Sequence, residues 1–343
     1  MTRLPFSPRV RQQGLSLTEL MISLTIGLLI SLAALLLYVS QRGSQALNED
    51  LARVQENGRA ATDLLQRELR LAGYIGCPSL AELTSLTQVA HPPLVPNLEH
   101  AQAIRGVEGG SANPDEVMLY RVSNQALPLR ANMSSPMADI PVQASRWNWP
   151  VGTLMLISDC QRADVFRLSA ATAIGDDALA HAASHNTQAN LSAAYGTMAQ
   201  VAPLLRIRYF IANNAAGNPA LFREVNGQAE EVVEHVRDLQ LTYGLDDGAG
   251  NPARVADGSV DRYVRANEVT DWTQVITVRA RVLLRSPDPN VLTGPPAAFF
   301  WDRDEDGDTD LDAATDADLQ ARRRLHVLTT TIALRNRAAL DRN

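Results

Sequence analysis

An uncharged apolar run from Leu20 to Gln41 constrains the fold of this 343-residue chain more than any other feature. As an α-helix its 22 residues would extend about 33 Å, and the hydrocarbon core of a bilayer is about 30 Å thick. Three positive side chains precede the run without any acid: Arg3, Arg9 and Arg11. Because positive flanks stay in the cytoplasm, the pattern predicts a transmembrane helix over about residues 17–40, with residues 1–14 inside and the C-terminus outside.

One acid, Glu19, stands at the start of this apolar segment. A charge near the centre of a bilayer costs roughly 2.5 kcal/mol or more, so an acid in a membrane segment is a functional candidate that needs a partner. A secretory signal peptide explains the segment poorly, because its apolar stretch is only about 7–15 residues long and ends at a small-residue cleavage site. A plain signal anchor explains the length and the arginines, but neither Glu19 nor Gly14, five residues before it.

The helical pattern continues beyond the apolar run. Apolar residues at spacings of three, four and seven form one stripe: Leu47, Leu51, Val54, Ala61, Leu65 and Ala72. Charged residues mostly occupy the other faces, as expected for a helix that packs on a globular domain. The two segments together predict one long N-terminal helix over residues 15–72, with Gly73 as its stop.

Residues 73–343 consist mainly of short β-branched or alternating runs, separated by Gly, Pro, Asn and Asp. The main predicted strands are 116–122, 153–157, 163–168, 204–211, 221–225, 232–243, 275–284 and 325–334. Short intervals without helices favour antiparallel pairing. The predicted fold class is therefore α+β, with a long N-terminal helix packed on a mainly antiparallel β head. The head is large enough for one large domain or two modest ones, and we favour two lobes with a boundary near residues 170–200.

Composition excludes several functions. The formal net charge of −7 argues against nucleic acid as a ligand, because binding phosphates requires a basic surface. All 31 basic residues are arginine, which excludes a Walker-type phosphate loop and a catalytic lysine. His181 and His185 have helical spacing but lack the glutamate of a zinc-protease motif, and no G-x-S-x-G motif occurs. We therefore expect no catalytic site.

A long segment between two predicted strands, residues 286–314, carries an acidic stretch. Acids alternate around Gly307 as in the first half of a calcium loop. By position, calcium would be bound by the side chains of Asp302, Asp304, Asp306 and Asp310 and by the carbonyl of Asp308. Ala313 stands where such a loop carries a glutamate, so a bidentate ligand would have to come from Asp312, one residue earlier, or from elsewhere. A solvated acidic turn that binds nothing specific is the alternative.

The sequence contains two cysteines, Cys77 and Cys160. Both follow the predicted span on its outward side, and an oxidising periplasm there would favour a disulfide between them. The alternative is two free buried thiols.

The N-terminal residues resemble the class III signal of type IV pilins and pseudopilins. Gly14 is followed by Leu15, and Glu19 is the fifth residue after the glycine, at the start of an apolar helix. The resemblance implies cleavage after Gly14 by a prepilin peptidase, N-methylation of Leu15, and pairing of Glu19 with the new amine during filament assembly. Two departures are Leu15, where major pilins usually carry Phe, and the absence of proline between residues 32 and 39.

Three segments of the head are similar to PilW-type minor pilins: residues 69–77 and 156–169, which contain the cysteines, and residues 232–264. The resemblance implies a pilin-like fold and a non-catalytic subunit that primes assembly with other minor pilins and the major pilin. Such a subunit sits at or near the filament tip, where it can carry a large adhesin. The implied location is the inner membrane, crossed once with the head in the periplasm, and then the pilus on the surface of a Gram-negative bacterium.

Two other classes compete with this interpretation. A type II secretion pseudopilin would share the N-terminal signal, but the segments around Cys77 and Cys160 favour PilW. A membrane-anchored periplasmic enzyme would need a catalytic constellation, for which the sequence gives no candidate.

Overall fold

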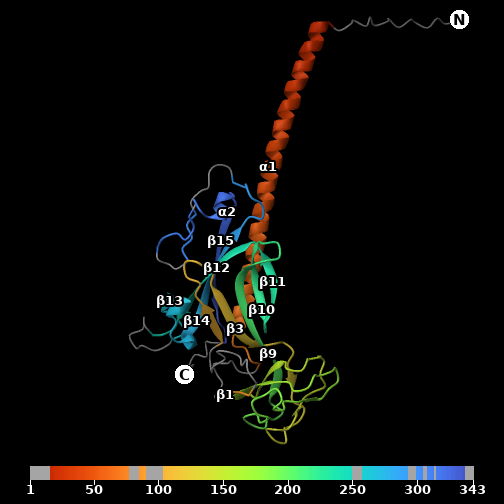
Figure 1. Cartoon of the computed structure of the whole chain (residues 1–343), viewed down its shortest axis with the longest axis vertical. Helices are drawn as coiled ribbons and strands as arrows, with labels where there is room; N and C mark the ends of the chain where they lie inside the picture. The colour runs from red at the N-terminus through yellow and green to blue at the C-terminus, as the bar shows by residue number, and fades with distance from the viewer. Residues whose placement is uncertain are drawn as a thin grey trace, which may run out of the picture. The chain divides into compact units, whose positions relative to one another are not determined.

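The computed structural model describes residues 16–76, 85–89, 103–248, 257–292, 299–303, 307–312 and 314–336. The chain divides into two compact units, Met1–Ala52 and Arg53–Asn343, and each is described by itself. One helix, α1 (Leu17–Arg70), contributes residues to both units (Figure 1). The predicted long N-terminal helix is confirmed, with its end at Arg70 instead of residue 72.

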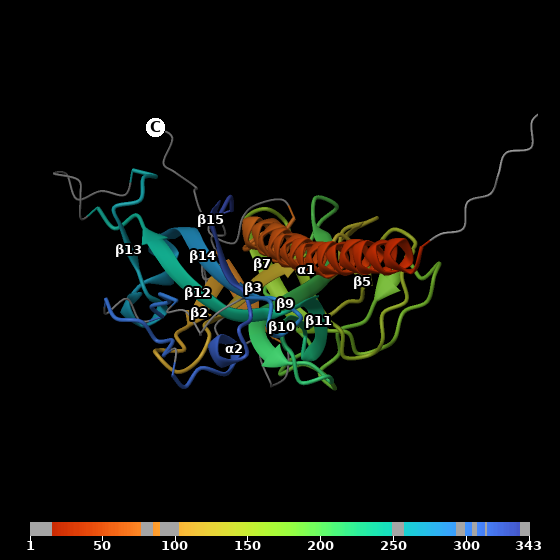
Figure 2. The same cartoon turned by 90° about the horizontal axis from the view of Figure 1, so that it is seen from above.

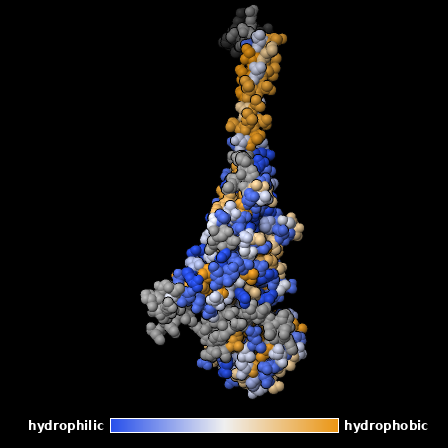
Figure 3. Space-filling model, turned by 60° about the vertical axis from the view of Figure 1, so that its left-hand side comes forward, coloured by the Kyte–Doolittle hydropathy of each residue, from blue (hydrophilic) through white to orange (hydrophobic). Residues whose placement is uncertain are grey.

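The N-terminal part of α1 is covered by hydrophobic side chains (Figure 3). Its large apolar residues, such as Leu28 and Leu36, are 72% and 63% exposed. Among the residues that the structure describes, α1 is the one helix long and apolar enough to cross a membrane. Its length and composition therefore agree with the predicted span.

The second unit begins with the last part of α1, whose apolar stripe is buried. Val54, Ala61 and Leu65 are at most 1% exposed and belong to the main hydrophobic core. Gly58 lies on the same side, where a Cβ atom would come within 2.1 Å of Leu328 Cδ1. A larger residue at this position would displace the Leu328 side chain, so glycine leaves room for that side chain against the helix.

Among the described residues, nine strands form the first sheet: β1 (Ser85–Gln88), β2 (Ile104–Val107), β3 (Glu116–Val122), β4 (Leu127–Pro128), β6 (Leu154–Ser158), β7 (Arg162–Arg167), β9 (Gln200–Asn213), β10 (Pro219–Val225) and β11 (Gln228–Glu234). The pairing is antiparallel except between β1 and β7. The long strand β9 pairs with β4 and β6 near its start and with β3 and β10 farther along.

The second sheet is antiparallel throughout and has the strand order β13-β12-β14-β15 (Figure 2). Its strands are β13 (Arg262–Val264), β12 (Val236–Leu245), β14 (Val275–Arg285) and β15 (Leu325–Ala333). Two short strands, β5 (Ile140–Pro141) and β8 (Ala178–Leu179), pair separately. Three short helices complete the described elements: η2 (Ala266–Glu268), η3 (Trp272–Gln274) and α2 (Ala317–Gln320).

Three clusters of buried apolar residues hold the head together. The main core joins the stripe of α1 to strands of both sheets. A second core lies on the other face of β6 and β7 from the main core and contains Phe166, Trp149 and Tyr195. A small third core contains Leu283, Trp301, Leu311 and Leu319. Residues 53–343 nevertheless count as one compact unit, and the boundary near residues 170–200 stays a prediction.

One predicted strand, 232–243, is two strands in the structure. The chain turns at His235, whose φ of 60° is rare for a residue with a side chain. Before this turn β11 pairs with β10 in the first sheet, and after it β12 pairs with β14 in the second. Hydrophobic alternation on both sides of His235 concealed the change of sheet.

Candidate functional site

The first residues of α1 form a capping box between Ser16 and Glu19. The backbone N–H of Ser16 donates to Glu19 Oε2 at 3.1 Å, and the backbone N–H of Glu19 donates to Ser16 Oγ at 3.2 Å. The Ser16 hydroxyl also donates to Glu19 Oε2, at 3.2 Å. These bonds satisfy N–H groups that a helix start leaves unpaired.

This box positions the Glu19 carboxylate beside the backbone that leads into the predicted processing site. Gly14 and Leu15 themselves lie outside the described residues. The structure thus adds Ser16, which is not among the predicted site residues. The S-x-x-E spacing of residues 16–19 is the sequence signal that could have identified it.

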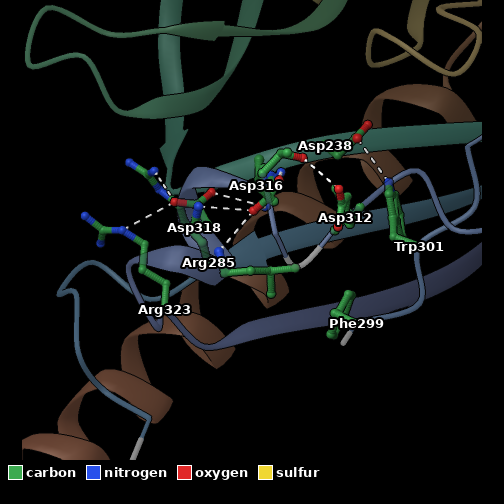
Figure 4. Close-up of polar contacts among 12 residues, drawn as sticks. Asp238, Arg285, Phe299, Trp301, Asp312, Asp316, Asp318 and Arg323 are labelled. Atoms are coloured by element: carbon green, nitrogen blue, oxygen red, sulfur yellow. Dashed lines mark hydrogen bonds and ion pairs between the residues drawn. The ribbon is translucent and has the colours of Figure 1, made fainter. Parts of the chain in front are cut away.

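The second candidate region is the acidic segment between β14 and β15, which Trp301 anchors in the head. Trp301 is fully buried, and its indole Nε1 donates to Asp238 Oδ2 at 3.0 Å (Figure 4). Its backbone N–H donates to Thr309 Oγ1 at 3.1 Å, and its carbonyl accepts the N–H of Asp310 at 2.7 Å. The two ends of the acidic turn are therefore joined at Trp301.

Asp238 on β12 is a fully buried carboxylate with three side-chain partners. Oδ2 accepts from the Trp301 indole and from Arg303 Nε, while Oδ1 accepts from Gln240 Nε2 at 3.0 Å. A buried carboxylate is tolerated only when it is paired and hydrogen-bonded in this way. The Arg303 guanidinium also donates to the carbonyl of Ser111, at 2.8 Å.

Near β15 the segment is held by a cluster of ion pairs around α2 (Figure 4). Asp316 pairs with Arg237, while Asp318 accepts from Arg285 Nη1 at 2.7 Å and lies 3.3 Å from Arg323 Nε. Burial favours the protonated carboxyl of Asp316, but its hydrogen bonds to Arg237 and to backbone N–H groups outweigh burial and hold its pKa below the usual value. The segment is therefore fixed at both ends by buried or half-buried charges.

The predicted calcium ligands fall into described and undescribed residues. Asp302 is 7% exposed, and its Oδ2 accepts the N–H of Gly307 at 3.0 Å. Its other oxygen, Oδ1, is buried and has no hydrogen-bond partner among the described residues. Asp310 Oδ2 accepts the N–H of Arg303 at 2.6 Å.

Asp304 and Asp306 lie outside the described residues, and Asp308 is exposed. Within the described ranges, no three His, Cys, Asp or Glu side chains come together as metal ligands.

Cys160 lies in the turn between β6 and β7 with a φ of 76°, and its N–H donates to Ser158 Oγ at 3.4 Å. Cys77 lies outside the described residues. The disulfide between the two cysteines stays a prediction.

Two family models match the chain, one at each end. The model described as Prokaryotic N-terminal methylation motif matches residues 9–35, which include Gly14, Leu15 and Glu19. The model described as Type IV Pilus-assembly protein W matches residues 208–336, from within β9 to just beyond β15. No curated protein and no solved structure matches the chain. The two matches support a PilW-type minor pilin.

Proposed function

We propose that the protein is a non-catalytic structural subunit that primes type IV pilus assembly and occupies the tip of the filament or a position near it. The observation that carries this proposal is the match to the pilus-assembly family over residues 208–336, since the N-terminal motif alone is shared by other pilin-like proteins. The partners we propose are a prepilin peptidase, other minor pilins, the major pilin and a large tip adhesin.

The proposed assembly step uses the charge of Glu19. Cleavage after Gly14 would create an amine on Leu15, next to Ser16, whose N–H and hydroxyl already contact the Glu19 carboxylate. An amine and a carboxylate are each costly in lipid, and pairing offsets part of both costs. Glu19 would bind this amine, either its own or that of a neighbouring subunit.

The size of the head supports a terminal position. The described residues of the compact unit that begins at Arg53 form two large sheets, one two-stranded sheet and three hydrophobic clusters. A subunit with so large a head fits the end of a filament better than a uniformly packed shaft. We further propose that α1 crosses the inner membrane once, with the head in the periplasm before assembly.

The substitution Glu19→Gln tests the assembly step. Glutamine can still form a capping box, so the helix start should persist while the charge is lost. We expect normal cleavage, shown by mass spectrometry of a methylated Leu15 terminus, but at least about tenfold less protein in sheared pili. Glu49→Gln, at an exposed acid of the same helix, is the control and should incorporate normally. A mature terminus elsewhere than Leu15, or unchanged incorporation of the Glu19 variant, would contradict the proposed step.

Deletion of the gene distinguishes a type IV pilus subunit from a type II secretion pseudopilin. A pilus subunit predicts loss of surface pili with intact protein secretion. Loss of secretion with normal piliation would instead identify a type II secretion pseudopilin.

We also propose that the turn beginning at Asp302 binds calcium. Support comes from the buried, unpartnered Oδ1 of Asp302, since a carboxylate oxygen in such a place requires a donor or a cation. Arg303, the basic residue of the acidic stretch, directs its guanidinium to Asp238 and Ser111 and so does not neutralise the turn. Arg281 donates to the backbone carbonyl of Asp302 at 3.1 Å and not to its side-chain carboxylate.

Calcium titration of the purified protein tests this proposal. At a hundredfold excess over the dissociation constant, binding stabilises the folded state by about 2.7 kcal/mol, so the midpoint of thermal unfolding should rise. Asp302→Asn should abolish the rise, whereas the control Asp139→Asn, at an exposed acid outside the acidic segment, should retain it. An equal midpoint with and without calcium in the unsubstituted protein would refute the site.

A further inference from the structure

A pocket of about 430 Å³ lies where the end of α1 meets the segment after β15. Among the described residues, its lining contains three arginines and one acid: Asp63, Gln66, Arg67, Arg70, Leu71 and Arg335. Residues 63, 66, 67 and 70 share one face of α1, because positions three and four apart are neighbours on a helix. The buried stripe of Leu65 and Leu69 occupies a different face, so this face is free of the sheet.

The three arginines of the pocket are unpaired in the part of the chain that the structure describes. No hydrogen bond or ion pair engages Arg67, Arg70 or Arg335 there. The acid next to Arg67 on the helix, Glu68, turns away and pairs with Arg121 at 2.9 Å. Many arginines of the head have carboxylate partners, whereas these three, which lie together, have none among the described residues.

The helix dipole explains why Arg67 and Arg70 are favourable at the end of α1, but it does not explain Arg335. Arg67 and Arg70 lie in the last turn of α1, where the negative end of the helix dipole favours a cation. Arg335 comes from a different element, and three like charges around one pocket repel one another. Asp63 supplies a single negative charge. In a chain with a formal net charge of −7, this concentration of positive charge indicates an anionic partner.

We propose that this pocket is a docking site for an acidic segment of a partner protein. The guanidinium group of arginine binds a carboxylate through two parallel hydrogen bonds. Three such groups can therefore bind more than one acidic side chain. A volume of about 430 Å³ exceeds what a single phosphate would fill. Leu71, which is 38% exposed, adds an apolar contact for the methylene groups of a glutamate. The proposal does not depend on the function proposed above, because the isolated protein can be tested for it.

The test is fluorescence anisotropy of a labelled hexaglutamate peptide mixed with the full-length protein in non-ionic detergent. At low ionic strength the protein should bind the peptide, and the reversals Arg67→Glu and Arg335→Glu should each weaken binding by about tenfold or more. The matched control is Arg146→Glu, which reverses an exposed arginine outside the pocket and should change affinity little. The unfolding midpoint of each variant shows that it is folded, and Arg67→Ala serves if a reversal destabilises the head.

Three results would overturn the proposal. The first is a peptide affinity that neither reversal changes, and the second is an equal loss in Arg146→Glu, which would indicate attraction to overall charge. The third is displacement of the peptide by an equal concentration of inorganic phosphate, which would indicate a small-anion site. If the Arg67 variant loses peptide binding but is cleaved normally and supports normal piliation, the pocket binds an acidic partner and the proposed function is unaffected.

Discussion

Replacing Leu65 by alanine is expected to lower the free energy of unfolding of the head by about 2.7–5 kcal/mol. Leu65 is fully buried in the main core, where α1 packs on strands of both sheets. The substitution removes apolar contacts and leaves a cavity that a closely packed core fills only in part. Urea unfolding followed by circular dichroism measures the change.

The adjacent Leu64 provides the matched control. It is partly buried and packs against the same core from its edge, so Leu64→Ala should cost clearly less. An equal decrease in the free energy of unfolding in the two variants would mean that the apolar stripe of α1 does not pack against the sheets as described.

Asp238→Ala is expected to destabilise the head by about 3–5 kcal/mol, because it removes one partner of a buried charge pair. The variant leaves the Trp301 indole N–H and the Arg303 guanidinium without their acceptor. The anchor of the acidic segment should then loosen, and Trp301 fluorescence should shift to longer wavelength as water reaches the indole.

Asp139→Ala removes the same charge at an exposed position of the head. We expect it to change stability by less than about 0.5 kcal/mol. A small effect of Asp238→Ala, or an equally large effect at Asp139, would contradict the anchoring role of Asp238.

The sequence predicted the long helix and most long strands because their signals are local. The stripe containing Val54, Ala61 and Leu65 has helical spacing, and the predicted strand 116–122 is β3 without change. Short strands such as β5 and β8 have two residues each and carry no periodicity of their own. The split at His235 depends on which sheet each half joins, which hydrophobic alternation does not encode.

In the candidate sites, too, the sequence predicted the features with a local signal and missed those that depend on tertiary contacts. Glu19 stood out because a single acid in an apolar run is visible in the sequence, and the capping box with Ser16 follows from a short spacing. The contact of Trp301 with Asp238 joins residues 63 positions apart, and no local pattern predicts it. The basic pocket likewise requires Arg335 to reach the end of α1, which only the tertiary structure brings about.

The 14-residue strand β9 has a mechanical consequence for a head under tension. Near its start it hydrogen-bonds to β6, beside the second core, and farther along to β3 and β10 at the main core. Because one continuous strand contributes residues to both cores, a force applied to one of them is transmitted to the other through its backbone.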